Sequence, residues 1–387
     1  MANTRKKKAE KLVDEVQEVS GISDELFDAV ISDIRKDFGD EGFQTHFETA
    51  KSFFSSGNLG INYAISEKAN GGFPEGLVTE IYGDHSTGKS LIAYHALVET
   101  QKRGGWAILI DTEYAFNQYW FDKIGGDNER LVYKNYDTIE DVFNYLDGIV
   151  DTIRIKHKSN VPVTIVWDSL AATSTKAEIE KGMDSSEMAM RARKSGQGFR
   201  KVLGKLKKNN ITLLIINQIR STMQMYGPDV DTVGGKAAKF AASVRMEVRK
   251  GKVIMGEDKH GNKTEIGING KVKVTKNRLR SPFAVSEFVV YWDEGIDPIS
   301  GYLDACLREG LIIKPSQGWY AYKNTPEDKF RQKDFAEVLE KHPELLGDIS
   351  NLSLDKFKKY AGTEQYEGTD DSVMIEEDEE SLEELVN

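Results

Sequence analysis

The sequence predicts an α/β protein in which a mostly parallel central sheet is covered by helices on both faces. Apolar runs of strand length alternate with helical segments between residues 77 and 217. This alternation is typical of parallel sheets, because each crossover helix returns the chain to the same edge. A glycine-rich loop also separates the first of these strands from the helix that follows it.

The core elements are expected in a regular order. The strands are runs of mainly apolar residues: 77–82, 106–111, 163–168 and 211–217. The helices between and after them are expected at residues 89–103, 139–153 and 191–208. Asp137 and Glu140 form a capping box that places the start of the second helix.

Less regular segments flank this core. Ser23 is placed to cap a helix whose apolar residues recur at helical spacing, and Gly39 would end it. After residue 239 the chain turns β-rich, with candidate strands at 244–249, 272–276 and 284–291 and a turn at 258–262. We expect four parts: a helical N-terminal segment (1–56), the α/β core (57–295), a small α/β domain (296–363) and an acidic tail (364–387).

Charge separates the tail from the rest of the chain. The formal net charge is −11, from 52 basic and 63 acidic residues. Residues 364–387 hold eleven of the carboxylates and no Lys or Arg, which leaves the rest of the chain neutral. This composition predicts disorder. The tail either aids solubility or competes with a polyanion for a basic surface.

Other bulk features exclude several classes of protein. The single cysteine, Cys306, forms no internal disulfide, and no Cys/His cluster suggests a structural metal site. The basic start of the chain has no apolar segment behind it, which argues against a signal peptide. The longest aliphatic runs have strand length and are too short to span a bilayer. We therefore expect a cytoplasmic protein with no membrane partner.

A phosphate-binding loop follows the first core strand. Its residues are Gly83, Asp84, His85, Ser86, Thr87, Gly88, Lys89 and Ser90. The glycines let the backbone wrap a polyphosphate, so that N–H groups and the start of the next helix face it. Lys89 would neutralise the β and γ phosphates, and the Ser90 hydroxyl would bind Mg²⁺. The motif and its context predict binding of a nucleoside triphosphate.

Polar residues end the neighbouring strands, where open α/β sheets bind their ligands. Asp168 ends an apolar strand, as the acidic residue of a Mg²⁺ site does. Glu113, just past the strand 106–111, is a candidate for orienting the attacking water, and Asp111 is its rival from spacing alone. Gln218 follows the last core strand, where it either senses a γ-phosphate or caps the strand.

Several stretches make the chain resemble the RecA-type homologous recombinases of bacteria and bacteriophages. In family order they are residues 80–90, 111–113, 168–172, 176–180, 217–220, 234–240, 273–278 and 318–323. The resemblance implies a RecA-like P-loop ATPase core, an N-terminal helical oligomerisation segment and a small C-terminal α/β domain. It also implies an ATP- and Mg²⁺-dependent recombinase that forms a helical filament on single-stranded DNA and pairs it with homologous duplex.

The resemblance assigns roles to individual residues. Glu113 would activate water, and Gln218 would couple the γ-phosphate to a DNA-binding loop. Lys276 and Arg278 would reach the ATP site of a neighbouring subunit, and Asn117 and Trp120 would contact adenine. The implied DNA contacts are Met188, Arg191, Arg193, Arg200, Arg220, Met223, Tyr226, Gly234 and Gly235. Further partners would be double-stranded DNA, other copies of the chain, and single-strand-binding and loader proteins.

The basic helix expected at residues 191–208 fits this resemblance. It concentrates Lys and Arg in one segment, although residues 1–363 are neutral overall, and such a segment can bind a phosphate backbone. Some features depart from the family. The second loop, about residues 220–233, is shorter than usual. The family's proline is absent at Asn117-Gln118, and Trp120 stands where a tyrosine is expected. Residues 1–56 match the family only loosely. A hexameric helicase of related fold is one rival, but it should carry a separate N-terminal domain. A filament-forming scaffold with little hydrolysis is another, but it should lack Glu113. A small-molecule kinase should have an Arg-rich lid.

Overall fold

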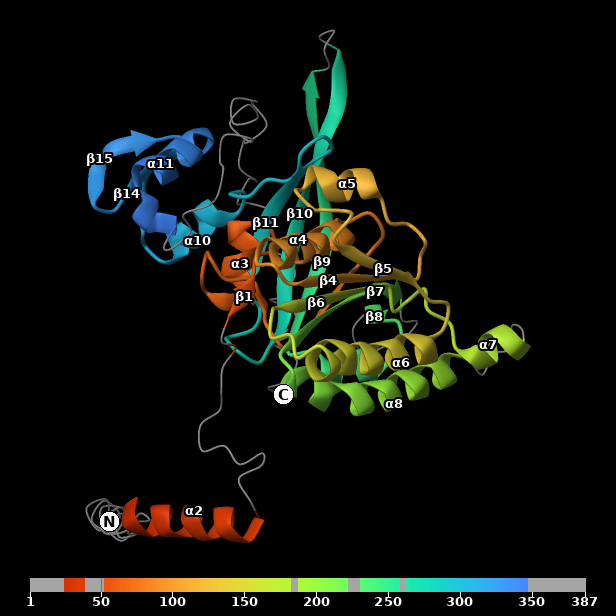
Figure 1. The fold of residues 1–387 in the computed structure, drawn as a ribbon. Coiled ribbons are helices and arrows are strands. Elements are labelled where there is room, and N and C mark those ends of the chain that lie inside the picture. The colour runs from red at the N-terminus through yellow and green to blue at the C-terminus, as the bar shows by residue number, and fades with distance from the viewer. Residues whose placement is uncertain are drawn as a thin grey trace, which may run out of the picture. The chain divides into compact units, whose positions relative to one another are not determined.

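The computed structural model describes residues 24–38, 50, 52–181, 187–221, 230–257 and 262–346. They belong to two compact units, one within Met1–Thr49 and the other from Ala50 onward. In the first unit α2 (Asp24–Phe38) is the helix that the sequence predicts (Figure 1). Its apolar side chains Leu26 and Phe27 are exposed. The acidic tail and the turn at 258–261 lie outside the described residues.

Within the described residues, a ten-stranded sheet forms the centre of the second unit (Figure 1). Its order is β12-β11-β10-β9-β3-β7-β6-β4-β5, and β8 pairs with β7 outside this path. Neighbouring strands from β9 to β5 are parallel, and those from β9 to β12 are antiparallel. The strands are β3 (Val78–Gly83), β4 (Trp106–Asp111), β5 (Leu131–Asn135), β6 (Val163–Asp168), β7 (Ile211–Ser221), β8 (Val230–Thr232), β9 (Val244–Glu257), β10 (Lys263–Asn277), β11 (Val285–Tyr291) and β12 (Gly295–Ile296).

Helices cover both faces of this sheet, with α4 on one face and α6 and α8 on the other (Figure 1). Successive residues of one strand therefore enter different cores: Leu109 packs with Leu97 of α4, and Ile108 with Val142 of α6. No described helix is both long and apolar enough to cross a membrane. The helices are α3 (Leu59–Ser66), α4 (Lys89–Lys102), α5 (Gln118–Lys123), α6 (Ile139–Val150), α7 (Lys176–Lys181), α8 (Glu187–Lys208), α9 (Lys236–Ala241), α10 (Tyr302–Arg308) and α11 (Phe335–Lys341).

The start of α6 differs from the expected capping box by one residue. Thr138 is the N-cap, and its Oγ1 accepts from the backbone N of Asp141 at 3.2 Å. The prediction of Asp137 as the cap is wrong, because its carboxylate instead accepts from the Tyr114 hydroxyl at 2.5 Å. The helix also runs on beyond Val150 into a turn of π-helix, Asp151–Lys156.

A smaller cluster lies beyond the large sheet. It is built on a three-stranded antiparallel sheet with α10 and α11, and its apolar residues include Tyr302 and Phe335. Leu59 of α3 belongs to the same apolar cluster, so the three-stranded sheet and its helices pack against α3. The remaining elements are β1 (Phe53–Phe54), β2 (Phe73–Pro74), β13 (Ile312–Ser316), β14 (Trp319–Tyr322), β15 (Thr325–Phe330) and the 3₁₀ turns Gln332–Asp334 and Pro343–Leu346.

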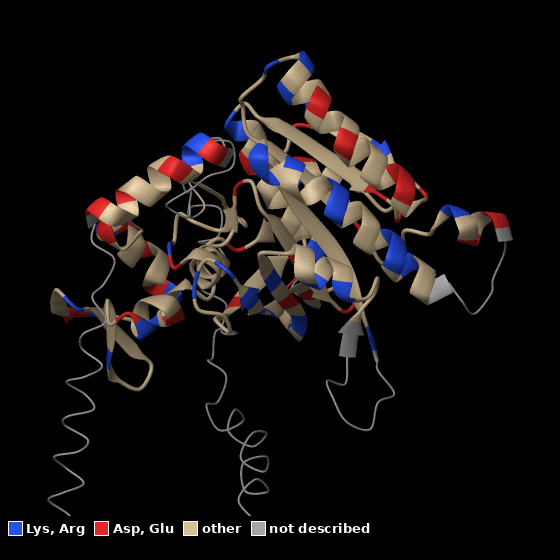
Figure 2. Cartoon of the chain, turned by 90° about the horizontal axis from the view of Figure 1, so that it is seen from below, with Lys and Arg blue, Asp and Glu red and all other residues tan. Residues whose placement is uncertain are grey.

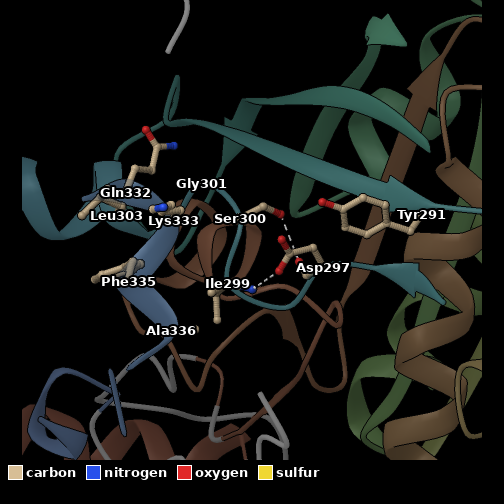
Figure 3. A pocket seen from close by; sticks show the side chains of 10 residues that line it. All are labelled: Tyr291, Asp297, Ile299, Ser300, Gly301, Leu303, Gln332, Lys333, Phe335 and Ala336. Carbon is tan, nitrogen blue, oxygen red and sulfur yellow. Dashed lines mark hydrogen bonds between the residues drawn. The ribbon is translucent and has the colours of Figure 1, made fainter. Parts of the chain in front are cut away.

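A cavity of about 50 Å³ lies where the loop after β12 meets α11 (Figure 3). Two hydrogen bonds within the loop fix its conformation. Asp297 Oδ1 accepts from Ile299 N at 2.9 Å, and the Ser300 hydroxyl donates to Asp297 O at 3.0 Å. No residue of the phosphate loop lines this cavity. It is therefore separate from the site described below.

Candidate functional site

Predicted functional residues meet at one edge of the sheet because their strands are parallel neighbours. Strands β3, β4 and β6 end there, whereas β7 passes this edge at Gln218 and continues to Ser221, beyond the strand end predicted at Asn217. Their register places Asp111 beside Asp168 and Gln218 beside Gly83. The ends of β4 and β6 are joined further, because Thr112 N donates to Asp168 O at 2.7 Å. The polar ends of three strands thus surround the phosphate loop.

The phosphate loop requires both of its glycines. Gly83 has a φ of +155°, and a Cβ there would lie 2.1 Å from the carbonyl oxygen of Val248 on β9. Gly88 has a φ of +90° and is the N-cap of α4, with no side-chain hydrogen bond to the helix. The first N–H groups of α4 are therefore not capped by the Gly88 position, which suits an anion. The loop fits a polyphosphate.

Lys89 is folded into this loop. Its side chain is 7% exposed, and its Nζ donates to the carbonyl oxygen of Asp84. Burial lowers the pKa of Lys89, while the nearby carboxylates of Asp168 and Glu113 raise it. Lys89 forms no ion pair with any described residue, so its ammonium is held near the loop by a neutral carbonyl. Such a cation is available to a phosphate group.

Ser90 and Asp168 form a pair of oxygen donors beside the loop. Burial raises the pKa of Asp168 to about 6, and hydrogen bonds from Ser90 and Tyr94 act in the opposite direction. The Tyr94 hydroxyl donates to Asp168 Oδ2 at 3.1 Å. A hydroxyl and a carboxylate suit Mg²⁺, which usually takes its other ligands from water and substrate phosphates. In the described part of the chain no group of three His, Cys, Asp or Glu could hold a metal.

Glu113 links the ends of three strands. Its Oε1 accepts from the Ser169 hydroxyl at 2.5 Å and from Gln218 Nε2 at 3.0 Å. Ser169 directly follows β6, and Gln218 lies on β7. The Glu113 side chain remains exposed. The structure therefore presents an oriented, solvent-facing carboxylate next to the phosphate loop.

Asp111, the rival carboxylate, has a different environment. It is 1% exposed, and its two oxygens accept from Glu113 N at 3.0 Å, Phe116 N at 3.0 Å and the Tyr133 hydroxyl at 2.9 Å. These bonds shape the loop after β4. Sequence reasoning gave no role to Tyr94, Ser169 or Tyr133, because their contacts depend on strand order; of the three, only Ser169 lies in a quoted motif, residues 168–172.

The expected adenine contacts lie at the start of α5. Asn117 is the N-cap, and its Oδ1 accepts from Trp120 N at 3.2 Å. The preceding Phe116 packs edge-to-face on Tyr94 of α4, with ring centroids 5.7 Å apart. This contact ties the α5 segment to the helix that begins at the phosphate loop. The contact of Asn117 and Trp120 with adenine stays a prediction.

Lys276 and Arg278 lie away from the phosphate loop of their own chain. Lys276 is opposite Arg245 of β9, which is itself beside Glu80 of β3, three residues before Gly83. At about 3.3 Å per residue, this row lies roughly 10 Å short of the loop along the strand. Both cations donate to backbone carbonyls of α9, at 2.6 and 3.2 Å.

The second predicted DNA loop extends from β7. Strands β7 and β8 form an antiparallel hairpin in which Ile219 pairs with Thr232. Arg220 is exposed on β7. Met223 and Tyr226 lie outside the described residues. The hairpin therefore carries the chain from Gln218 toward this loop and back.

Gly234 and Gly235 follow β8 and start α9. Their φ values are +83° and +70°, and a Cβ on Gly235 would lie 2.9 Å from Cβ of Ala192 on α8. These positions favour glycine both for backbone conformation and for the close approach of α8. A contact of either glycine with DNA stays a prediction.

The basic charge of α8 is partly neutralised by neighbouring acids, so less of it is free than the sequence suggests (Figure 2). The pairs are Lys194 with Glu140 at 3.2 Å, Lys201 with Asp147 at 2.8 Å, Lys205 with Asp147 at 2.6 Å and with Asp151 at 2.8 Å, and Arg191 with Glu178 at 3.0 Å. Arg193 and Arg200 are exposed and form no ion pair with a described residue. The Met188 side chain lies outside the described residues.

Known proteins resemble this chain over most of its length. A family model described as the RecA N-terminal domain matches residues 25–297. Protein RecA of Corynebacterium glutamicum (strain R) is 35% identical over 355 residues, 90% of this chain and 89% of that protein. Protein RecA of Enterococcus faecalis is 33% identical over 363 residues, 92% of this chain and 96% of that protein. Protein RecA of Clostridium tetani is 35% identical over 305 residues, 78% and 82% of the two chains.

Proposed function

The chain belongs to the RecA family, and we propose that it performs the family's reaction with the residues at the carboxyl edge of its sheet. It is an ATP-dependent recombinase of DNA repair and a DNA-dependent ATPase. The hydrogen bond between Gln218 and Glu113 carries the proposed mechanism, because it joins a candidate base to the strand that leads into a DNA loop.

The phosphate loop would bind the triphosphate of ATP. N–H groups at the start of α4 and the Lys89 ammonium face the site where the β and γ phosphates would lie. Ser90 and Asp168 would hold Mg²⁺, which neutralises phosphate charge when it is bound. Asn117 and Trp120 would contact adenine from the start of α5.

Glu113 is our candidate for orienting the attacking water. Its carboxylate is exposed, and Ser169 and Gln218 hold one oxygen in place. Asp111 is a weaker candidate, because its oxygens already accept from three donors that shape the loop. A positioned carboxylate of this kind would take a proton from water as it attacks the γ-phosphate.

The Gln218 side chain would change its hydrogen-bond partner when a γ-phosphate is present. Its amide now bonds to Glu113, and a γ-phosphate would offer a competing, charged acceptor. Because β7 continues from Gln218 into the hairpin with β8, a shift of this amide would reach the second DNA loop. ATP binding would thereby favour a DNA-gripping state, which hydrolysis would release.

We propose that each ATP site is shared between neighbouring copies in a helical filament. Lys276 and Arg278 lie away from the phosphate loop of their own chain, where a second copy could receive them. The exposed apolar residues of α2, such as Leu26 and Phe27, offer a surface on which a neighbouring copy could dock. DNA binding and oligomerisation belong to the family, and the helical arrangement is our proposal.

Single-stranded DNA would follow the exposed cations Arg193 and Arg200 and the loops next to them, and homologous duplex would be paired with it. Single-strand-binding and loader proteins are proposed as further partners. The reaction requires access to cellular DNA, and we place the protein in the cytoplasm on that ground.

The proposed function is tested by D-loop formation. Purified protein is mixed with ATP, Mg²⁺, supercoiled duplex and a labelled homologous single strand, and joint molecules are resolved on a gel. We expect joint molecules with the homologous strand only, and none with the Lys89→Ala variant. Unwinding of a forked duplex without any joint molecules would instead identify a helicase.

A further inference from the structure

A buried ion pair crosses the sheet close to Lys276. Glu80, in the middle of β3, is 0% exposed, and its Oε2 accepts from Arg245 Nε of β9 at 2.5 Å. The Arg245 side chain is 13% exposed. Moving two charges from water into the protein costs free energy unless they are well paired. Packing stability alone therefore does not explain why a charged pair occupies this position.

On one side the pair contacts Asn217 of β7. Glu80 Oε1 accepts from Asn217 Nδ2 at 2.8 Å. The same Nδ2 donates to Val233 O at 3.0 Å, and Asn217 Oδ1 accepts from Gln218 N at 2.9 Å. Glu80 therefore anchors the residue that comes just before the amide bonded to Glu113.

On the other side the pair reaches β10. The Arg245 guanidinium lies over the ring of Tyr82, 4.5 Å from its centroid. The Tyr82 hydroxyl forms a 2.8 Å hydrogen bond with Thr275 Oγ1, directly before Lys276. Lys276 is also the register partner of Arg245. The polar chain thus runs from β7 through β3 and β9 to the strand end that carries Lys276 and Arg278.

We propose that Glu80 and Arg245 are positioning residues. They would hold Gln218 of β7 and the end of β10 that carries Lys276 and Arg278 at fixed positions relative to each other. The inference rests on the proposed function, since it assumes that Lys276 and Arg278 act in a neighbour's site. Neither positioning residue touches the phosphate loop. Buried, charge-assisted hydrogen bonds hold a fixed geometry where apolar contacts would tolerate sliding.

The pair can be removed without leaving a lone buried charge. The double variant Glu80→Met and Arg245→Met keeps side-chain length, and buried ion pairs commonly tolerate apolar replacements of similar volume. Ile215→Val is the matched control, because Ile215 is the register partner of Glu80 on β7 and changes only packing. Arg245→Lys keeps the charge and serves if the double variant does not fold. Thermal unfolding of each variant is measured first.

The test uses mixed subunits assembled on single-stranded DNA. An acceptor with Lys276→Ala and Arg278→Ala keeps its phosphate loop, and a donor with Lys89→Ala keeps its cations. ATP hydrolysis by the mixture therefore needs both subunits. We expect the Met pair in the donor to lower kcat roughly tenfold or more, since small misplacements of catalytic groups are costly, with an unchanged KM for ATP. Arg245→Lys in the donor should retain an intermediate kcat.

Three other outcomes would contradict the inference. Full kcat with the Met-pair donor would overturn it and leave the shared site intact. An equal loss with the Ile215→Val donor would assign the effect to packing. If the unmodified donor and acceptor give no hydrolysis together, the shared-site part of the proposed function is wrong, and the inference falls with it.

Discussion

Gln218 Nε2 donates a hydrogen bond to Glu113 Oε1 at 3.0 Å, between residues 105 positions apart in the sequence. The contact joins the ends of β7 and β4, and Ser169 at the end of β6 bonds to the same carboxylate oxygen. One carboxylate is thereby connected to Gln218 within β7 and to Ser169, which directly follows β6. We expect hydrolysis and DNA affinity to depend on this single junction.

Glu113→Gln should abolish most ATP hydrolysis while nucleotide binding remains. The amide keeps the shape of the side chain but cannot take a proton from water, which should slow turnover roughly 10²–10⁴-fold. Hydrolysis is followed by phosphate release and binding by titration with a fluorescent ATP analogue. Near-normal hydrolysis in this variant would move the role of base to Asp111.

Asp111→Asn should act mainly on stability. The carboxylate accepts three hydrogen bonds while buried, and weakening them should lower the free energy of unfolding by about 1–3 kcal/mol. Urea unfolding measures this change. A variant of normal stability that has lost hydrolysis would show that Asp111 acts in the chemistry.

Asp168 should contribute a loss of stability to the Mg²⁺-free protein as pH rises from about 4 to about 6. Burial raises the pKa of Asp168 to about 6, above the unfolded value of roughly 4, so the folded protein binds more protons between these values. The unfolded state ionises first and is favoured as pH rises. Mg²⁺ should restore stability above pH 6, because it binds the ionised carboxylate.

Urea unfolding across this pH range, with and without Mg²⁺, checks the prediction. Asp168→Asn should remove both the fall with pH and the gain from Mg²⁺. If wild type and Asp168→Asn respond to pH and Mg²⁺ in the same way, Asp168 is not the metal-binding residue.

Two adjacent cations of α8 should differ in their effect on DNA binding. Arg200 is exposed and forms no ion pair with a described residue, whereas Lys201 pairs with Asp147 at 2.8 Å. Arg200→Ala should weaken binding to single-stranded DNA and reduce the slope of log affinity against log salt by about 0.7. Lys201→Ala is the matched control and should change the slope little. A wild-type slope for Arg200→Ala would remove Arg200 from the DNA path.

Removal of residues 364–387 should raise affinity for duplex DNA at low salt. These residues carry eleven carboxylates, which compete with DNA for basic surfaces of the same molecule. The difference should fade as salt rises, because such contacts are screened over about 10 Å at 0.1 M ionic strength. Duplex titrations of full-length and truncated protein measure it. Identical affinities at every salt concentration would leave the tail a role in solubility or partner binding.

The strands at the centre of the sheet were predictable because they are buried on both faces. Continuous apolar runs at 106–111 and 163–168 match β4 and β6 at both ends. Several other elements were missed, and three of them show why. Helix α3 is buried nearly all round and so shows no periodic face, β5 is a half-exposed edge strand, and α5 is short.

The long hairpin of β9 and β10 was predicted only in part. The sequence indicates strands at 244–249 and 272–276, whereas β9 and β10 run over Val244–Glu257 and Lys263–Asn277. The missing portions are paired strands, but they carry many exposed polar residues, such as Lys250 and Lys252. Where both faces of a paired strand are exposed, its side chains need not be apolar, so the sequence shows no strand pattern.

The parts of the site that lie within short sequence motifs were predictable. The phosphate loop and Asp168 follow from strand, loop and helix signals within short segments. The choice between Asp111 and Glu113 could not be made from spacing, because it depends on which donors surround each carboxylate. The pairing of Lys201 with Asp147 was equally hidden, since it requires knowing that α6 and α8 lie side by side.

We propose that Gln218 couples the bound nucleotide to the affinity for DNA. Fluorescence anisotropy of a labelled single strand tests it, in ADP and in a slowly hydrolysed ATP analogue, for wild type and Gln218→Ala. We expect wild type to bind the strand more tightly with the analogue than with ADP. In Gln218→Ala this difference should largely vanish while nucleotide affinity is kept. If Gln218→Ala retains the full difference, Gln218 does not couple the nucleotide to DNA affinity.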